Sequence, residues 1–591
     1  MKKLLLLLLL ATAVLIPASA QQVTVRLETA GTLPEHITEE TKYTIRNLRV
    51  EGELNGTDIR LLRDMAGRMN VNTATKGQLD TLDLSAARIV SGGEPYFTWA
   101  GQEYRTADDV LPPYFLLYCR DIKSFQMPES LRAIGDQALA SCESLEEIVL
   151  PEGLDSIGLA PFINCDKVEE LIVPDNVTKI SHASFQRMGG LKRITLGAGI
   201  RSIDTSSFVN DDVLECITLG KNLTEFDALT FYTLPCLQRI ETDEENPSYT
   251  SIDGVLFTKD KATLFYHPGG RDEETYVIPA SVTTLREHCF AANPSLTAMD
   301  IPSSVQTIGL GAFLNCGSLQ TVTLHEGLRT VGTGAFGSCE NLMEIEFPAS
   351  VETVEGGVFL ACNALERIRV AADSEHFTTQ DGALYDKEMR TLISFPCGYD
   401  TEFYEIPGTV ETIDSYAFAC HPTLKNAYLP PSVRTVGEGA FFACPQLLRL
   451  IFSEGIDSIA TGVLDLCDKM DAVFFLGATP PGHVDDYALY NDRLYELGAL
   501  YVPEAALEDY KAKQWVVLRE LGYSEQLFKY ISGLTDADIA EITGIRPAVA
   551  DYPAERLPEV YTLDGRHAGT LQRGINILRR PDGTSQKFLL K

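Results

Sequence analysis

Three glycines have the spacing of a dinucleotide-binding loop. Gly332, Gly334 and Gly337, in the stretch VGTGAFGSC, spell G-x-G-x-x-G, a pattern that cradles a pyrophosphate when it joins a strand to a helix in a βαβ unit. The chain, however, repeats itself every 23 residues, and the equivalents of Gly337 in the neighbouring repeats are Leu314 and Leu360. Since that position requires no glycine, we predict a turn of the repeat and no nucleotide cofactor.

Thirteen cysteines raise three alternatives, which are buried thiols, disulfides or a metal site. Most share one position of the repeat, where Met188 and Leu234 also occur, so we expect an apolar packing slot. Asp211, Asn293 and His421 fall in the same slot and indicate that it lies near an edge. Without a C-x-x-C pair or zinc-like spacing, we expect no metal. Buried thiols are favoured, although export permits disulfides between adjacent coils. The cysteines of this slot are Cys119, Cys142, Cys165, Cys316, Cys339, Cys362, Cys444 and Cys467.

Other patterns of catalysis are missing from the sequence. It contains no G-x-S-x-G, no H-E-x-x-H and no complete EF-hand loop. Carboxylate pairs are too frequent among 83 acidic residues to single out an acid–base couple. The sequence therefore predicts a protein that is not an enzyme and that carries no cofactor.

Composition and the N-terminal residues restrict the partners and the location. The formal net charge of −34 disfavours nucleic acid. Residues 1–20 combine two lysines, an apolar run of thirteen residues and the sequence Ala-Ser-Ala, which is typical of a cleaved signal peptide. Thirteen residues are too few to span a bilayer, and no second apolar span follows. We expect export to the extracellular space or the outer cell surface, with no transmembrane segment after cleavage.

The motif glycines and the cysteines of the shared slot belong to one repeated element. The copies beginning at Pro302, His325 and Pro348 follow one another at 23-residue steps and share one apolar pattern. Each copy ends in an alternating stretch that predicts a short strand, and its middle, such as GAFGSC, predicts a turn of α- or 3₁₀-helix. Strand-plus-short-helix units of this length indicate a leucine-rich repeat. The interior copies carry a phenylalanine eleven residues after their start, at Phe162, Phe185, Phe208, Phe231, Phe290, Phe313, Phe336, Phe359, Phe418 and Phe441.

Copies of the type IPSSVQTIGLGAFLNCGSLQTVTL carry a resemblance to a known family. They resemble the BspA-like class of bacterial leucine-rich-repeat surface proteins. The resemblance implies an α/β solenoid and adhesion to host or neighbouring-cell molecules. We predict an array of about twelve 23-residue coils over residues 116–475.

Two interruptions break the register of the array. Residues 243–278 and 371–406 each contain an Asp-Gly pair between strand-like runs, which predicts a β-hairpin. These hairpins are interpreted as decoration on the solenoid edge, with a ligand-contacting lobe as the alternative, because insertions in repeat arrays often lie on the binding face.

The remaining segments are expected to close or extend the array. We predict an N-terminal cap over 21–115, a C-terminal cap over 476–530, a linker over 531–553 and a β-segment over 554–591. Exposed ends of such arrays need polar caps for solubility. The last segment looks like short C-terminal β-segments of secreted Bacteroidetes proteins, some of which act in sorting to the cell surface. A simple structural hairpin is the alternative.

Outward-facing strand residues are the positions where a partner would bind. By register, Arg367 and Arg369 form a basic step beside Glu344 and Glu346. This step is the first of two predicted binding regions.

The second predicted region combines apolar residues with an arginine. Tyr428, Ile451 and Phe474 fall in line on three successive coils next to Arg449, and aromatic residues with arginine are the composition of interface hot spots. Two alternatives stay open, a ligand patch or an apolar line covered by the closing segment, which contains Tyr501 and Trp515.

Three functional hypotheses follow from these patterns. The first is an exported surface protein that binds a protein or glycan partner on host or neighbouring cells by many weak contacts. The second is a carbohydrate-handling accessory protein or enzyme, which predicts a deep pocket of carboxylates and aromatic residues. The third is a structural envelope protein. Fold alone does not decide among them.

Overall fold

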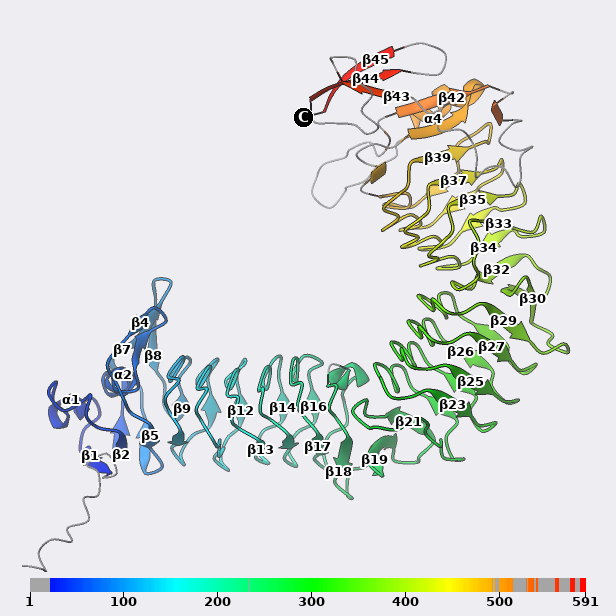
Figure 1. Cartoon of the computed structure of the whole chain (residues 1–591). Coiled ribbons are helices and arrows are strands. Elements are labelled where there is room, and N and C mark those ends of the chain that lie inside the picture. Colours follow the sequence, from blue (N-terminus) through cyan, green and yellow to red (C-terminus); the bar gives the residue numbers. More distant parts are fainter. Residues whose placement is uncertain are drawn as a thin grey trace, which may run out of the picture. The chain divides into compact units, whose positions relative to one another are not determined.

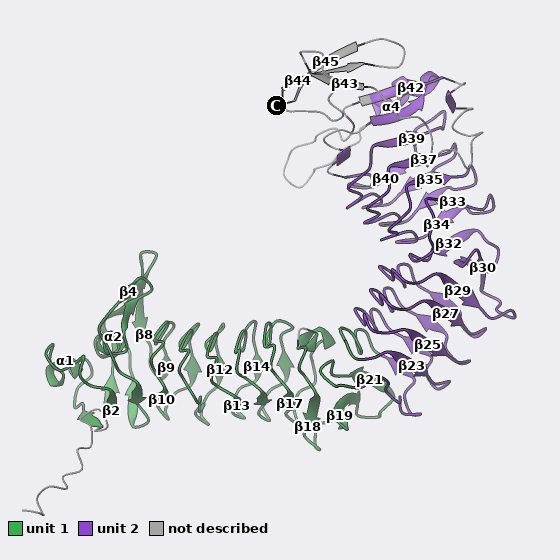
Figure 2. Ribbon diagram, in the orientation of Figure 1, with its two compact units in different colours: residues 1–272, 286–295 green, residues 273–285, 296–591 purple. Residues whose placement is uncertain are grey.

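The computed structural model describes two compact units of one chain (Figure 2). One comprises residues 1–272 and 286–295, and the other comprises 273–285 and 296–591. The described residues are 22–232, 234–491, 493–494, 499–513, 528, 530–535 and 538–539, together with the backbone of strands 559–562, 574–579 and 585–590. The predicted signal peptide, Trp515 and most of the predicted linker lie outside them.

The first unit begins with mixed elements and continues as parallel coils (Figure 1). Strands of successive coils pair in parallel with an offset of 23 residues, as Leu171, Ile194, Ile217 and Ile240 do along β13, β15, β17 and β18. The elements are β1 (Val23–Arg26), α1 (Leu33–His36), β2 (Asn47–Leu54), α2 (Gly56–Met65), β3 (Arg68–Asn70), β4 (Thr73–Ala74), β5 (Thr81–Asp83), β6 (Ala87–Ile89), β7 (Gly92–Trp99), β8 (Gln102–Thr106), β9 (Val110–Leu111), β10 (Ser124–Gln126), β11 (Ala133–Ile134), β12 (Ser156–Ile157), β13 (Glu170–Ile172), β14 (Lys179–Ile180), β15 (Arg193–Thr195), β16 (Ser202–Ile203), β17 (Cys216–Leu219), the 3₁₀ helix η2 (Ala228–Phe231), β18 (Arg239–Thr242), β19 (Tyr249–Ile252), β20 (Val255–Thr258) and β21 (Thr263–Tyr266).

The second unit repeats the same coil with two ladders of parallel strands. Longer strands such as β27 and β29 pair on one side of the coil, and two-residue strands such as β24, β26 and β28 pair on another. The elements are β22 (Thr284–Leu285), β23 (Ala298–Ile301), β24 (Thr307–Ile308), β25 (Thr321–Leu324), β26 (Thr330–Val331), β27 (Glu344–Phe347), β28 (Thr353–Val354), β29 (Arg367–Val370), β30 (Phe377–Gln380), β31 (Ala383–Asp386), β32 (Thr391–Ser394), β33 (Phe403–Glu405), β34 (Thr412–Ile413), β35 (Asn426–Leu429), β36 (Thr435–Val436), β37 (Arg449–Phe452), β38 (Ser458–Ile459), β39 (Ala472–Phe475), β40 (His483–Val484), β41 (Ala499–Pro503), η3 (Glu504–Ala506), α4 (Leu507–Ala512), β42 (Tyr530–Leu534), β43 (Glu559–Thr562), β44 (Gly574–Arg579) and β45 (Ser585–Leu590).

The phenylalanine column predicted from the repeat is confirmed. The ring centroids of Phe313 and Phe336 lie 5.4 Å apart with an interplanar angle of 4°, and those of Phe336 and Phe359 lie 5.8 Å apart at 17°. The three side chains are buried. Like side chains therefore stack above one another, and each coil packs its apolar residues against its neighbours, as a repeat array requires.

The middle of one coil is the predicted 3₁₀ turn, η2, but the middle of the coil that contains Phe313 differs from a turn of helix. Its amides alternate between two directions, because Phe313 N–H donates to Ala335 O of the next coil at 2.8 Å whereas Leu314 N–H donates to Gly311 O of its own coil at 2.9 Å. Alternate amides therefore bond a neighbouring coil and cannot make the hydrogen bonds of a continuous helix. Gly334 has a φ of +60°, which also leaves the helical path. The glycines of the opening motif accordingly form the turn that the repeat predicts.

The cysteine slot holds buried thiols. All thirteen cysteines lie among the described residues and are free. The thiol of Cys339 contacts Phe313 O at 3.3 Å and that of Cys165 contacts Leu139 O at 3.3 Å. Burial raises the pKa of the Cys339 thiol, because charge is disfavoured away from water. The thiols of Cys165 and Cys339 therefore act as small apolar groups that donate weakly to the preceding coil.

The polar residues of the same slot do not mark an edge, and that expectation is wrong. Asp211, Asn293 and His421 are all fully buried. Met188 N–H donates to Asp211 Oδ1 at 2.7 Å, and Leu424 N–H donates to His421 Nδ1 at 3.1 Å. Each polar occupant therefore accepts a backbone hydrogen bond that a cysteine does not accept.

Both insertions contain the predicted hairpins. Asp253-Gly254 joins antiparallel strands β19 and β20, and Asp381-Gly382 joins β30 and β31. All four turn residues have left-handed φ values, as two-residue hairpin turns require. The first three residues of β20 and all but the last of β31 are buried, and β32 rejoins the short-strand ladder by pairing with β34. The hairpins are thus part of the core, and the interpretation as edge decoration is wrong.

Side chains of the N-terminal elements supply donors at the start of the coil ladder. In each coil, carbonyl groups accept amide donors from the coil before. At the first coil these donors are the Arg63 guanidinium, which reaches Phe115 O at 2.8 Å, and the Tyr96 hydroxyl, which reaches Pro113 O at 2.7 Å. Arg63 is fully buried. The Arg63 and Tyr96 side chains therefore supply the donors that a preceding coil supplies elsewhere. They satisfy buried carbonyl groups that would otherwise be unpaired.

Strands β41 and β42 extend the longer-strand ladder beyond β39. Residues 531–534, expected to begin the linker, form most of β42. The last segment forms the antiparallel strands β43, β44 and β45. Among the described residues, every helix is too short or too polar to cross a bilayer.

Candidate binding face

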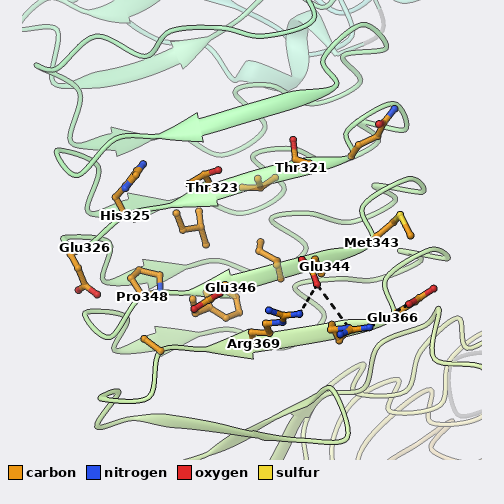
Figure 3. Close-up of a pocket in the computed structure, with 17 residues that line it drawn as sticks. Thr321, Thr323, His325, Glu326, Met343, Glu344, Glu346, Pro348, Glu366 and Arg369 are labelled. Carbon is orange, nitrogen blue, oxygen red and sulfur yellow. Dashed lines mark ion pairs between the residues drawn. The ribbon is translucent and has the colours of Figure 1, made fainter.

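An open hollow lies on the outward surface of β25, β27 and β29 in the second unit (Figure 3). Its volume is about 850 Å³. Alternation along these strands buries Val322, Ile345 and Ile368 and turns the intervening residues outward. The strands present different outward chemistry, because β25 offers threonines, β27 glutamates and β29 arginines. A regular core therefore displays an irregular polar surface.

The predicted basic step forms part of this hollow. Arg369 lies 3.2 Å from the Glu344 carboxylate, and Arg367 lies 3.9 Å from the same oxygen and 3.9 Å from Glu366. These side chains are about half exposed. Exposed ion pairs contribute little to stability, about 0–1 kcal/mol. Their role is therefore to set the local charge of the face, and both arginines are accessible to a partner.

The second predicted region lies in a covered apolar cluster. Tyr428, Ile451, Phe474 and Tyr501 follow one another in register along β35, β37, β39 and β41. The rings of Phe474 and Tyr501 stack at 4.8 Å. Ile451 and Phe474 are only 1% and 2% exposed. Of the two alternatives, the covered line fits and the free ligand patch does not.

Arg449 shares the burial of this cluster, with 7% of its surface exposed. Tyr428 is partly buried and packs against the cluster. The closing strands β41 and β42 supply Tyr501 and Leu534 to it, as the sequence alternative expected for Tyr501. Trp515 lies outside the described residues. Of the predicted binding residues, Arg367 and Arg369 are therefore accessible. The other four are buried or partly buried, namely Tyr428, Arg449, Ile451 and Phe474.

A family model described as a BspA type leucine rich repeat region matches six copies in this chain. The copies lie within residues 110–238, 265–386 and 394–497, which make up more than half of the chain. The chain belongs to this BspA-type leucine-rich repeat family. Its fold is a β-solenoid of parallel-strand coils with few helices.

Solved structures with the same repeat are similar over parts of the chain. A leucine rich cell surface protein from Faecalibacterium prausnitzii is 23% identical over 58% of this chain and 84% of that chain, with a TM-score of 0.38. A leucine-rich repeat protein from Bacteroides ovatus is 21% identical over 58% and 75%, with a TM-score of 0.34. One from Bacteroides capillosus is 30% identical over 21% and 99%, with a TM-score of 0.20. The comparison with curated proteins found no match.

A histidine, a serine and an aspartate lie close together in the first unit. Ser206 Oγ contacts His182 Nδ1 and lies 2.6 Å from Asp204 Oδ1. Asp204 Oδ1 also lies 3.7 Å from His182 Nδ1, so the hydroxyl and the carboxylate face the same ring nitrogen, whereas a catalytic triad places them at opposite nitrogens. In the described part of the chain, no group of three or more histidine, cysteine, aspartate or glutamate residues is placed to hold a metal ion.

Met343 is the exposed apolar residue among several residues of the hollow that the sequence did not predict. It precedes β27, lines the hollow and is 57% exposed. Register analysis considered only outward positions within strands, and this residue lies in the turn before one. An apolar side chain where the preceding repeat has Gln320 and the next has Glu366 is the signal that could have identified it.

Proposed function

We propose that this protein is an exported, surface-associated binding module that holds a protein or glycan partner on the outward face of β25, β27 and β29. The observation that supports the proposal is the hollow of about 850 Å³, lined by accessible arginine, glutamate, threonine and methionine side chains. These residues are free of the packing demands that bury the alternate positions. The N-terminal sequence supports export, and the family membership supports a binding role.

The proposal is tested by filling the hollow. Thr321 and Thr323 are exposed on β25, so the double variant Thr321→Tyr/Thr323→Tyr blocks the face without touching the core. The matched control is Ser124→Tyr/Gln126→Tyr, at the exposed positions of β10. Both variants should keep the wild-type melting temperature.

Wild-type and variant proteins are incubated with arrays of glycans and matrix proteins at low and high salt. We expect the β10 control to retain the partners of the wild type and the β25 variant to lose them. Equal retention by the β25 variant places binding elsewhere and contradicts the proposal. Turnover of an array glycan, instead of retention, favours the carbohydrate-handling hypothesis.

A further inference from the structure

The glutamates that line the hollow differ in whether they have a partner within the protein. It is lined by four glutamates and two arginines, which gives a formal charge of −2 with histidine neutral. Glu344 and Glu366 lie next to the arginines. Glu326 accepts the backbone N–H groups of Ala349 and Ser350 at 2.9 and 3.0 Å.

Glu346 differs from the other three glutamates. It stands directly opposite Arg369 in the register of β27 and β29, but the Arg369 guanidinium turns diagonally to Glu344 (Figure 3). Within the described residues, Glu346 has no ion pair and no hydrogen bond, and its side chain is exposed. The face therefore carries one free carboxylate, between Thr323 of the preceding repeat and the outward-turned Arg369.

An anion must displace an existing ion pair to bind at this surface, whereas a cation need not. An anionic group that binds Arg367 or Arg369 has to compete with Glu344 for the guanidinium. A cationic group above Glu346 gains a partner without breaking an existing pair. The chain charge of −34 adds long-range attraction for a basic partner.

An apolar contact lies at a fixed distance from the free carboxylate. Met343 is three residues before Glu346, and because an extended chain spans about 3.3–3.6 Å per residue, their Cα atoms lie no more than roughly 10–11 Å apart. Met343 is 57% exposed and stands at the opposite end of the hollow from Pro348 (Figure 3). Methionine adapts its shape to different apolar partners.

From this arrangement we propose that the partner is a protein segment with a lysine or arginine within about 10 Å of an apolar side chain. The basic side chain lies over Glu346 beside the Thr323 hydroxyl, and the apolar side chain contacts Met343. The inference rests on the proposed function, because it names the partner class for the same face.

The probes are twelve-residue peptides, immobilised in an array, that carry one leucine and one lysine at varied spacing. We expect the strongest binding at a spacing of two or four residues, which places the leucine and the lysine on the same face of an extended peptide. Matching peptides with glutamate in place of lysine, and acidic oligosaccharides, represent an anionic partner. Higher salt should weaken the lysine peptides, because it screens exposed charges.

Three variants should change the affinity for a basic ligand and for an anionic ligand in opposite directions. Glu346→Gln should weaken the lysine peptides about 2- to 5-fold, the effect of one exposed charge, and Met343→Ser should weaken them as well. Arg367→Gln/Arg369→Gln releases Glu344 and should strengthen them by a similar factor. The control Glu375→Gln/Glu388→Gln removes two exposed charges outside the hollow and should leave binding unchanged.

Loss of binding in Arg367→Gln/Arg369→Gln, or preference for the glutamate peptides or the oligosaccharides, overturns the basic partner. If Thr321→Tyr/Thr323→Tyr abolishes binding while Glu346→Gln has no effect, the hollow binds but the inference is wrong. If neither variant changes binding, the proposed function itself fails at this face.

Discussion

Asp211 makes stability depend on pH in a direction opposite to that of most carboxylates. The side chain is fully buried in the cysteine slot, with Met188 N–H donating to Oδ1 at 2.7 Å and no partner for Oδ2 in the described structure. Burial raises the pKa of Asp211 from 3.8 to about 8, with the neighbouring Asp212 charge adding to the rise. The folded protein therefore binds a proton that the unfolded chain releases above about pH 4.

The sign and size of the effect follow from this shift. A raised folded-state pKa means that stability is full below about pH 4 and falls until about pH 8. Between the unfolded-state pKa of 3.8 and pH 7 lie about three pH units. At about 1.4 kcal/mol per unit, the folded protein loses about 4 kcal/mol of stability over this range. Above pH 8 the loss levels off at about 6 kcal/mol. Asp211→Asn keeps an acceptor for Met188 N–H and removes the titration.

The assay is urea unfolding of the wild type and of Asp211→Asn across this pH range, followed by circular dichroism. We expect the variant's advantage in free energy of unfolding to grow between pH 4 and pH 8 and then to stay constant. Met188→Leu, at the same slot without a titrating group, should differ from the wild type by a constant amount. An advantage of Asp211→Asn that does not change with pH would refute the reasoning.

Three further predictions concern single residues. Gly334→Ala should lower the free energy of unfolding by about 1 kcal/mol, because φ is +60°, whereas Gly317→Ala, also in open space but without a left-handed φ, should be neutral in chemical denaturation. Burial lowers the pKa of His421 to about 4, so stability should fall between about pH 6.5 and pH 4, and His421→Leu should remove this loss in melting curves measured against pH. Alkylation of the native protein should label exposed Cys236 well before buried Cys339, and equal labelling in mass spectrometry would contradict the burial.

The repeat was predictable from the sequence because each coil needs the same apolar positions. Phe313, Phe336 and Phe359 recur at 23-residue steps and stack as predicted. A turn of helix was confirmed at η2 but was wrong at Phe313, whose amide bonds the next coil, since that choice depends on the position of the neighbouring coil. A local sequence pattern contains no information about such a partner.

Burial of polar and outward positions was harder to predict for a related reason. Asp211 is buried because the repeat places its backbone position in the core, and its own polarity does not change that placement. Ile451 and Phe474 point outward from their strands, but β41 and β42 extend the sheet and contribute Tyr501 and Leu534 to the same cluster. Register tells which side of a strand a residue occupies, and only the tertiary structure tells whether that side meets solvent.

This distinction also explains why the proposed binding face lies where it does. In every coil the inward positions are fixed by packing, so only outward positions can vary in chemistry without loss of the core. Toward β39 and β41 the outward positions are used to close the array. On β25, β27 and β29 they remain exposed, and the unpaired Glu346 contributes little to folding in that state. A charged residue that has no ion pair or hydrogen bond among the described residues and faces an open hollow is the residue whose substitution best separates a binding role from a structural one.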